Sequence, residues 1–360
     1  MWVYINMNLS LFKQTSNEME VANNHNSFGF TIVELLVVIV VIGILVAITI
    51  VSYTGLSSKA TVASLQSDLS SASKKLKIDQ VINNNYPTNL ADAVNRKIIS
   101  YDSNTTPAYV VNNNITPQVF CLSYTKNSQT YKVTETGTST TGDCTNYLPV
   151  LYLDAGNTAS YPGTGTTWTD LSGLGNNGTL VNGVGYTSAN GGALTFDGVD
   201  DYVNAPATVS SMPYSVEIWF SQSELRNLCL VTTSTLGNSH VSGILSNKLI
   251  TYADGSYYTY SSRIFSSSDI NKFIYAVFVF EEVAGDRQLK NYVNGSLDGS
   301  NIAGGVLPFP GGQTRIGNQV SGSGFGILKG SISSVRVYNR ALSSLEITQN
   351  FNTLKGRYGL

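Results

Sequence analysis

One carboxylate stands at the head of a long apolar run in this 360-residue sequence. Residues 35–51 are uncharged, and counting back from them to Phe30 gives about the 20 residues that a helix needs to cross a bilayer. Glu34 lies inside that run. An ionised group in hydrocarbon costs several kcal/mol or shifts to its neutral form, so a membrane helix normally excludes a lone acid. The acid therefore calls for a partner of opposite charge.

The residues around Glu34 follow a specific order. The polar break Ser27-Phe28-Gly29 lies before the apolar core, whereas a secretory signal has a shorter core with its cleavage site after it. The order resembles the class III signal of type IV prepilins and pseudopilins: this break, then Phe30 and Glu34, then LLVVIVVIGILVA. The resemblance implies that prepilin peptidase cuts after Gly29, that Phe30 is the N-methylated terminus, and that Glu34 is the assembly acid. The alternative is a plain anchor helix with a stray acid.

The resemblance supplies a partner for the acid. After cleavage Phe30 carries a free ammonium, which a filament of packed helices must bury. The Glu34 carboxylate of a neighbouring subunit can pair with it, because two charges that are costly alone are tolerated as a pair. We expect this pair to fix the axial step between subunits as well.

The three cysteines do not show the clustered spacing of a zinc site. Cys121 and Cys144 flank a polar segment that can fold back as a hairpin and bring them together. The sequence predicts a disulfide between them if this region is exported, with two unrelated free thiols as the alternative. Cys229, in the apolar run NLCLVTT, is expected to be a buried small hydrophobe rather than a nucleophile.

Motifs that would indicate an enzyme fail on their context. GLGNNG (Gly173–Gly178) fits the dinucleotide pattern, but no hydrophobic strand precedes it and no helix is expected after it. A glycosidase needs two carboxylates about 5–10 Å apart across a cleft. Glu217 stands alone, and we expect it on the polar face of a strand. We expect Glu281-Glu282 at an exposed strand end, and His240, the one histidine beyond the leader, in a loop. No catalytic residue is predicted.

Two other groups of side chains have open interpretations. Asp197, Asp200 and Asp201 can contribute to a calcium site, or they can stabilise a turn through side-chain hydrogen bonds. The prediction is therefore no cofactor and no metal site, with calcium left open. Three tyrosines can stack on sugars or pack in a sheet: Tyr257, Tyr258 and Tyr260.

The element that carries Glu34 is expected to continue beyond the membrane run as an amphipathic helix. Apolar residues recur there at spacings of three and four: Val62, Leu65, Leu69, Ala72 and Leu76. The helix is expected to cover residues 30–82 and to stop at NNNYPTN, because asparagines and Pro87 break helices. Residues 83–147 then indicate a short helix and several strands, which is a small α+β head like that of pilins.

From Leu148 onward the helical periodicity disappears, and short β-rich runs alternate with Gly, Asn and Asp turns. Asn294-Gly295 between alternating residues is a strong hairpin signal. Roughly a dozen strands over residues 148–360 predict a two-sheet sandwich or jelly roll. The order of the phrases resembles the concanavalin A-like, laminin-G-type jelly-roll family: WTDLSGLGNNGTL, LTFDGVDDYV, VEIWF, YVNG and GSISSVRVYNRALSSLEITQNFN.

The bulk composition limits the partners. Only 12% of the residues are charged and the net charge is −2, which argues against nucleic acid, since that partner needs a basic stripe. The Gly-, Ser-, Thr-, Asn- and Tyr-rich composition suits a turn-dense β protein outside the cytoplasm. The predicted fold class is multi-domain: a leader (1–29), a transmembrane and stalk helix (30–82), an α+β head (83–147) and an all-β jelly-roll sandwich (148–360).

These features together predict a minor pilin or pseudopilin that is not an enzyme. The resemblance implies processing by prepilin peptidase and assembly with other pilin subunits into a type IV pilus or a type II secretion-like filament. The chain is expected to cross the cell membrane once and to display its jelly roll on the extracellular surface, where it binds glycan or a surface protein in adhesion. The alternatives are a structural cap or spacer without ligand and, less favoured, a membrane-tethered polysaccharide hydrolase.

Overall fold

A computed structural model describes residues 31–360, apart from 116–117, 207, 210–211, 236–237, 254–256, 305–311 and 320–324. The predicted leader lies outside the described residues, and so do Gly29 and Phe30. The chain divides into two compact units, residues 1–59 and 60–360. The domain boundaries expected after residues 29, 82 and 147 stay predictions.

The first element is one long helix, α1 (Ile32–Asn83). Its first part exposes mainly Ile, Leu and Val side chains, and it is long and apolar enough to cross a membrane. Farther along, the residues Leu65, Leu69, Ala72 and Leu76 are buried, as their spacing predicts. The helix ends where Asn84 takes a left-handed φ of 59°, shortly before Pro87.

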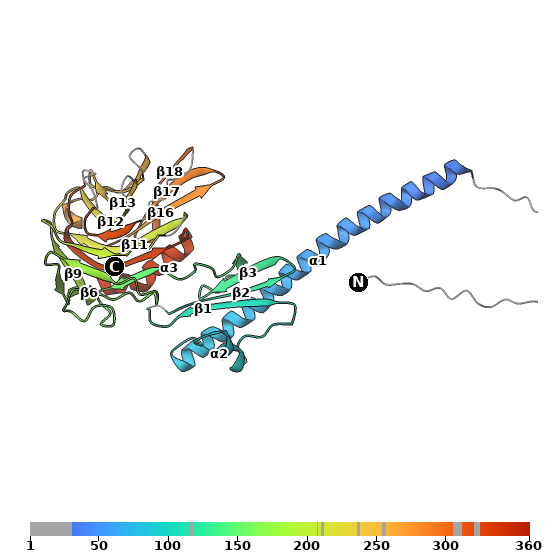
Figure 1. The fold of residues 1–360 in the computed structure, drawn as a ribbon, viewed down its shortest axis with the longest axis horizontal. Helices are drawn as coiled ribbons and strands as arrows, with labels where there is room; N and C mark the ends of the chain where they lie inside the picture. Colours follow the sequence, from blue (N-terminus) through green and yellow to red (C-terminus); the bar gives the residue numbers. More distant parts are fainter. Residues whose placement is uncertain are drawn as a thin grey trace, which may run out of the picture. The chain divides into compact units, whose positions relative to one another are not determined.

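The second part of α1 packs against a small antiparallel sheet (Figure 1). Its strand order is β1 (Thr106–Asn112), β2 (Val119–Lys126), β3 (Gln129–Thr134) and β4 (Thr140–Thr141), and the short helix α2 (Leu90–Asn95) precedes it. The apolar stripe of α1 meets side chains from β2 and β3: Phe120, Leu122, Tyr124 and Val133. These elements make an α+β head around one helix.

The described residues beyond the head form two eight-stranded sheets, with more strands than the roughly dozen expected. One sheet has the order β15 (Tyr257–Tyr260), β14 (Lys248–Ala253), β13 (Asn238–Leu245), β12 (Leu228–Thr235), β19 (Gln313–Ile316), β10 (Tyr202–Ala205), β7 (Gly178–Val181) and β6 (Thr167–Trp168). The other has the order β18 (Ser296–Gly304), β17 (Asp286–Val293), β16 (Ile274–Val283), β11 (Tyr214–Gln222), β20 (Lys329–Tyr338), β9 (Ala193–Asp197) and β8 (Gly185–Thr187), and β5 (Leu151–Asp154) also pairs with β20.

The main core lies between these sheets, as the sandwich prediction requires. Successive side chains of a strand point to opposite faces, so β11 contributes to two layers. Val216, Ile218 and Phe220 enter the core between the sheets. Trp219 points to the other face, where it belongs to a second apolar cluster. The predicted fold class, an N-terminal helix followed by an antiparallel sandwich, is confirmed.

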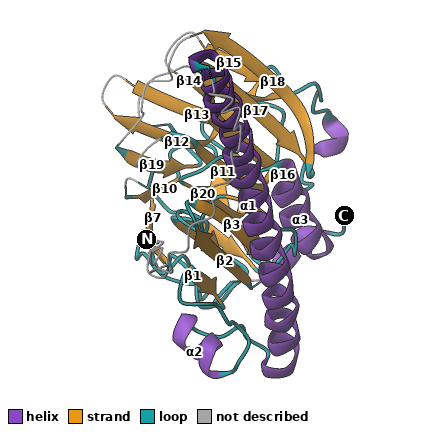
Figure 2. Cartoon of the chain, turned by 90° about the vertical axis from the view of Figure 1, so that its right-hand side faces the viewer, coloured by secondary structure: helices purple, strands orange, loops and turns teal. Residues whose placement is uncertain are grey.

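That second cluster exists because a helix covers the outer face of the sheet. Helix α3 (Ser344–Leu354) buries Ile347 and Leu354 there and lies near β16 (Figure 2). Its start is a capping box, in which the Glu346 amide donates to Ser343 Oγ (3.3 Å) and the Ser343 amide donates to Glu346 Oε2 (2.9 Å). The expectation that helical structure ends at Leu148 was wrong, although the Ser-x-x-Glu signal was present in the sequence.

The hairpin between β17 and β18 is confirmed. Asn294 and Gly295 take φ values of 48° and 84°, which a two-residue turn of this type requires. Gly295 is needed for a second reason, because a Cβ there would meet the Phe351 ring of α3 at 3.1 Å. The turn therefore both reverses the chain and makes room for the helix.

Candidate functional site

The acid singled out by the sequence lies in the first turn of α1. Glu34 Oε2 accepts hydrogen bonds from the Thr31 amide (2.8 Å) and from Thr31 Oγ1 (2.9 Å), and the Glu34 amide donates to Thr31 Oγ1 (3.2 Å). This reciprocal capping box satisfies amides that have no partner inside the helix, and it places a negative charge at the positive end of the helix dipole. Within the single chain, the carboxylate is thus fixed by its own helix. Its pairing with an amine of another subunit stays a prediction.

The predicted disulfide is confirmed. Cys121 on β2 and Cys144 form a disulfide, with their Cα atoms 5.6 Å apart. Both residues are buried and pack with Tyr147. The bond therefore fastens the segment after β4 to the head sheet.

Removing this disulfide is expected to lower the free energy of unfolding by about 3 kcal/mol, because the bond closes a loop of moderate length in the unfolded chain. The two cysteines are 23 residues apart. Denaturant unfolding of the full chain in detergent, with and without reductant, measures the effect. The Cys121→Ser/Cys144→Ser pair should be no less stable than either single variant, since one bond is lost in all three. Identical midpoints for the reduced and oxidised protein would contradict the prediction.

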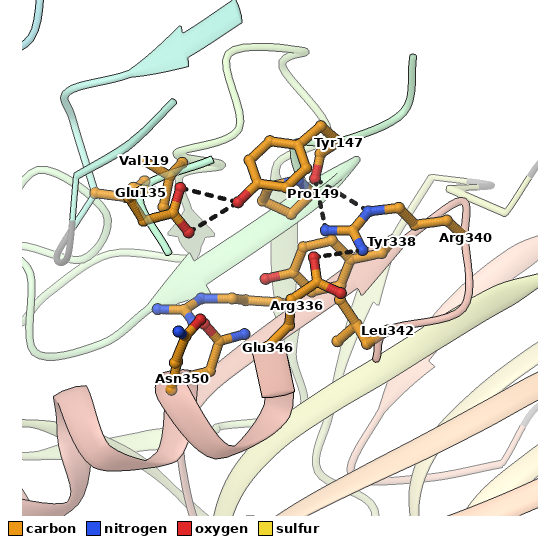
Figure 3. Close-up of a pocket in the computed structure, with 12 residues that line it drawn as sticks. Val119, Glu135, Tyr147, Pro149, Arg336, Tyr338, Arg340, Leu342, Glu346 and Asn350 are labelled. Atoms are coloured by element: carbon orange, nitrogen blue, oxygen red, sulfur yellow. Dashed lines mark hydrogen bonds and ion pairs between the residues drawn. The ribbon is translucent and has the colours of Figure 1, made fainter. Parts of the chain in front are cut away.

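A pocket lies where the head, the segment after it and the jelly roll meet (Figure 3). Its walls come from the end of β3, from residues 147–149, from β20 and the residues after it, and from α3. The lining residues are Ile115, Val119, Glu135, Tyr147, Pro149, Arg336, Tyr338, Arg340, Leu342, Glu346, Gln349 and Asn350. Its volume is only about 30 Å³, room for about one water molecule. The pocket is therefore too small for a sugar. We call this region, with the lining residues named above, the junction.

Polar contacts in the junction connect these parts of its wall. Tyr147 Oη donates to both oxygens of Glu135, at 2.8 and 2.9 Å (Figure 3). Arg340 donates from Nε and Nη2 to the Tyr147 carbonyl (3.3 and 3.1 Å) and pairs through Nη1 with Glu346 (2.8 Å). Burial raises the pKa of the Glu135 carboxyl, although the hydrogen bond from Tyr147 acts in the opposite direction. These side chains join the head to the jelly roll, and their polar groups are occupied by contacts with one another.

The raised pKa of Glu135 predicts a pH dependence of stability. The folded chain holds the proton more tightly than the unfolded chain, so this contribution is present below the ordinary pKa of 4.5 and is lost as the pH rises through the raised value. Glu135→Gln keeps an acceptor for Tyr147 and removes the titration. We expect the fall in stability above pH 4.5 to be smaller in the variant, which should melt at or above the parent temperature at pH 7.

Thermal melts of the full chain from pH 4 to 8 measure this difference. The exposed acid Asp68 on α1 provides the matched control, because Asp68→Asn should keep the pH profile of the parent. A Glu135→Gln profile parallel to that of the parent would exclude Glu135 as the source of the dependence.

Deeper in the junction, Glu217 forms a buried ion pair that was not expected. Arg336 Nη1 lies 2.9 Å from Glu217 Oε1, and Asn350 Nδ2 donates to Glu217 Oε2 (2.9 Å). Glu217 and Arg336 are only 2% and 3% exposed. The expectation that Glu217 lies on the polar face of a strand is therefore wrong, because α3 covers this face with apolar side chains. With both oxygens engaged, this carboxylate is poorly placed to act as a general acid or base.

Sequence reasoning missed Arg336, although a signal existed. Glu217 stands in the apolar strand SVEIWF, and Arg336 stands in the apolar strand SVRVY. Two single opposite charges, each flanked by apolar residues, are expected to meet if both faces of their strands are buried. Arg336 also donates to Tyr152 Oη (2.9 Å).

His240 lies on strand β13 and not in a loop, so that expectation was wrong. It is 1% exposed because β13 pairs on both sides, with β12 and β14. Its Nδ1 lies 2.7 Å from Tyr214 Oη, and its ring stacks on Phe280 with centroids 5.0 Å apart. Cys229 is free and buried, as predicted, and burial raises the pKa of its thiol to about 12. Both side chains are core residues.

The aspartates of the FDGVDDYV phrase lie in the loop between β9 and β10. The Val199 amide donates to Asp197 Oδ1 (2.8 Å), and the Asp197 amide donates to Asp201 Oδ2 (2.9 Å), so the turn-stabilising bonds considered for this loop are present. One carboxylate oxygen from each of Asp197, Asp200 and Asp201 also lies within 4.8 Å of the others. Burial, and then the neighbouring carboxylates, raise the pKa of Asp201.

The remaining sequence candidates are strand residues. Tyr257 is buried and its Oη donates to the carbonyl of Arg287 (2.9 Å), whereas Tyr258 is 46% exposed. Tyr258 and Tyr260 meet edge to face with centroids 5.3 Å apart. Glu281 and Glu282 lie near the end of β16. Glu282 is exposed as expected, whereas Glu281 is partly buried and pairs with Lys290.

Among the described residues, these features define a protein with an apolar N-terminal helix, a head that contains one disulfide, and a jelly-roll domain. Two segments match models of known families. Residues 24–50 match the prokaryotic N-terminal methylation motif, and residues 197–348 match the concanavalin A-like lectin/glucanases superfamily in its laminin-G form. The chain thus joins a prepilin-type N-terminal segment to a concanavalin A-like domain, as the resemblance predicts.

Several solved structures are similar to part of the chain. Domain 4 of AbnA, an extracellular GH43 arabinanase from Geobacillus stearothermophilus in complex with arabinotriose, is 17% identical, with a TM-score of 0.45 over 56% of this chain and 97% of that chain. The botulinum neurotoxin type G receptor binding domain is 14% identical (TM-score 0.44, 57% and 51%), and the binding domain of Paraclostridial Mosquitocidal Protein 1 is 13% identical (TM-score 0.44, 58% and 52%). The chain spans about half the length of these two toxin domains. No curated protein matches the chain.

Proposed function

We propose that this protein is a minor pilin or pseudopilin that assembles through α1 into a type IV pilus or type II secretion-like filament and displays its jelly roll for adhesion. The observation that carries the proposal is the methylation motif at residues 24–50, with Glu34 in the first turn of an apolar helix. Gly29 is the cleavage residue, Phe30 the methylated terminus and Glu34 the assembly acid.

The capping box at Thr31 supports this assignment. Before assembly, the Glu34 carboxylate in the membrane is bound by the start of its own helix, which reduces the cost of keeping it there. In the filament, the ammonium of a neighbouring Phe30 replaces or shares these donors. Prepilin peptidase, other pilin subunits and the membrane are therefore the proposed partners.

The jelly roll is proposed as a binding module for a glycan or a surface protein, not as an enzyme. Three side chains that could act as an acid, base or nucleophile have structural contacts instead. Glu217 contacts Arg336 and Asn350, His240 contacts Tyr214, and Cys229 is buried in the core. The contacts of Arg340 with Tyr147 and Glu346 support a fixed mounting of this module on the head. We place the module on the extracellular surface.

Mass spectrometry of the N-terminus tests the assembly class. A mature chain that begins at N-methylated Phe30 in the surface fraction is the expected result, and an intact residue 1–29 segment in assembled protein would refute the proposal. Glycan arrays and cell-binding assays test the display function. Failure to bind in both would leave the structural spacer, and polysaccharide cleavage lost in a single-carboxylate variant would favour the hydrolase.

A further inference from the structure

A row of polar side chains crosses the outer face of the sheet that contains β10 and β19. Strands β19, β10, β7 and β6 are neighbours in this sheet, and Figure 2 labels the first three of them. Their register places one polar residue of each strand opposite the next: Arg315, Asn204, Thr179 and Thr167. We call these four residues the polar row. Ile316, Val203 and Leu180, which alternate with them along the strands, belong to the core between the sheets, so the polar row lies on the opposite face.

Arg315 gives the polar row a positive charge. Five of the seven arginines beyond residue 148 form ion pairs with carboxylates, whereas Arg315 forms none in the part of the chain that the structure describes. Its guanidinium lies over the Tyr202 ring, with Cζ 4.3 Å from the ring centroid, and its Nη1 donates to the Gln319 carbonyl (2.9 Å). These two contacts hold the planar group in place and leave its charge unpaired.

Two buried atoms of the polar row provide an independent indication of a ligand. Arg315 Nε and Asn204 Oδ1 belong to residues that lie opposite each other on β19 and β10, and neither atom has a hydrogen-bond partner among the described residues. A buried donor or acceptor without a partner is costly, so both atoms are explained if a ligand group completes them. Because Gln319 occupies Nη1, the donors Nε and Nη2 remain, and these two nitrogens match the two oxygens of a carboxylate.

The rest of the polar row indicates which kind of molecule carries that carboxylate. Thr179 and Thr167 are exposed, and together with the Asn204 amide they can exchange hydrogen bonds with ligand hydroxyls. Three steps between neighbouring strands give the row a length of about 14 Å, which suits a chain of sugars better than a single ring. The row contains no apolar side chain, whereas the centre of a protein–protein interface is usually apolar.

We propose that the polar row binds an acidic saccharide. The ligand carboxylate pairs with Arg315 through a bidentate, charge-assisted contact, and the ligand hydroxyls bond to the amide and hydroxyl groups of the other three residues. This inference rests on the proposed role of the jelly roll as a binding module. It narrows the ligand from a glycan or a surface protein to a glycan that bears carboxylates.

A glycan array probed with the purified full chain in detergent tests the ligand class. The array carries glycans that contain uronic or sialic acids beside the same glycans with each carboxyl group reduced to an alcohol. We expect binding to acidic glycans and at least about tenfold weaker binding to their carboxyl-reduced forms, because hydrogen bonds to charged groups are stronger than neutral ones. Equal binding to both members of each pair would overturn the inference.

The same experiment separates this inference from the display function on which it rests. Binding to neutral glycans alone, or to cells but to no glycan, would overturn the acidic-saccharide site and leave the display function standing. A chain that binds neither glycans nor cells would refute both.

Variants on the same array test the residues. Arg315→Gln should weaken binding to acidic glycans by at least about tenfold, and Arg315→Lys should recover only part of it, because an ammonium keeps the charge without the parallel donors. Arg287→Gln is the matched control and should bind as the parent does, since Arg287 also lies over a tyrosine ring, that of Tyr257 (5.2 Å), but belongs to β17 of the other sheet.

A second variant keeps the test open if Arg315→Gln does not fold. Thr179→Glu places an acid at an exposed position of the polar row, so it is expected to fold and to weaken binding to acidic glycans through charge repulsion. Thr179→Gln, of the same size and neutral, should bind more tightly than Thr179→Glu. Parent-like binding by folded Arg315→Gln, or equal binding by the two Thr179 variants, would overturn the site.

Discussion

Replacing Glu34 with glutamine is expected to reduce incorporation into filaments by roughly 100-fold or more. Breaking a buried ion pair by removing one partner costs about 3–5 kcal/mol, and each 1.4 kcal/mol is about tenfold in an equilibrium. If the proposed pairing holds, the variant would bury the amino group of a neighbouring Phe30 without a counter-charge. The measurement is the ratio of sheared surface filament to membrane-bound subunit in cells that express the variant.

A matched control separates the charge from general polarity. Thr49 lies in the same apolar part of α1, and its Oγ1 donates to the Val46 carbonyl (2.9 Å). Thr49→Val removes this polar group without changing charge, so it should assemble as the parent does. N-terminal mass spectrometry of Glu34→Gln should still show cleavage after Gly29, since the cleavage site is intact. Normal assembly of Glu34→Gln would show that Glu34 is not needed for assembly and only caps its own helix.

The features that the sequence predicted correctly are mostly local ones. The helical stripe of Leu65, Leu69, Ala72 and Leu76 follows from a spacing within one element, and the Asn294-Gly295 turn follows from two adjacent residues. The Cys121–Cys144 disulfide required only that a polar segment fold back on itself. In each case the sequence near the residue determines the outcome.

The features that sequence reasoning missed depend on what covers a surface. Glu217 was expected on the polar face of a strand; its apolar neighbours hinted at burial, but the helix α3 that covers this face lies far away in sequence. Arg336, its partner, is 119 residues away in sequence. Likewise, His240 was expected in a loop, and its place in β13 comes from pairing with strands on both sides. Thr31, the cap of Glu34, was not predicted, although the Thr-x-x-Glu pattern of a capping box is present in the sequence.

The buried pair of Glu217 and Arg336 gives the second large expected effect. Glu217→Gln or Arg336→Met should each lower the free energy of unfolding of the jelly roll by about 3–5 kcal/mol, because each leaves one buried charge without its partner. For a domain of this size, that loss corresponds to a fall in melting temperature of roughly 6–20 °C. Fluorescence of Trp168 and Trp219 reports the transition, since both side chains are almost fully buried in the jelly roll.

A double replacement distinguishes a charge effect from a loss of packing. Glu217→Leu with Arg336→Met removes both charges, and buried pairs replaced by apolar residues of similar volume are often neutral in stability. We expect the double variant to be more stable than either single charge-removing variant, but below the parent, because Arg336 also donates to Tyr152 and stacks on its ring at 4.2 Å. Glu224→Gln, which breaks exposed pairs with Arg226 and Lys329, is the control and should change stability by less than about 1 kcal/mol. If Glu217→Gln and Glu224→Gln melt at the same temperature, the buried pair contributes little to stability, and apolar contacts hold the junction.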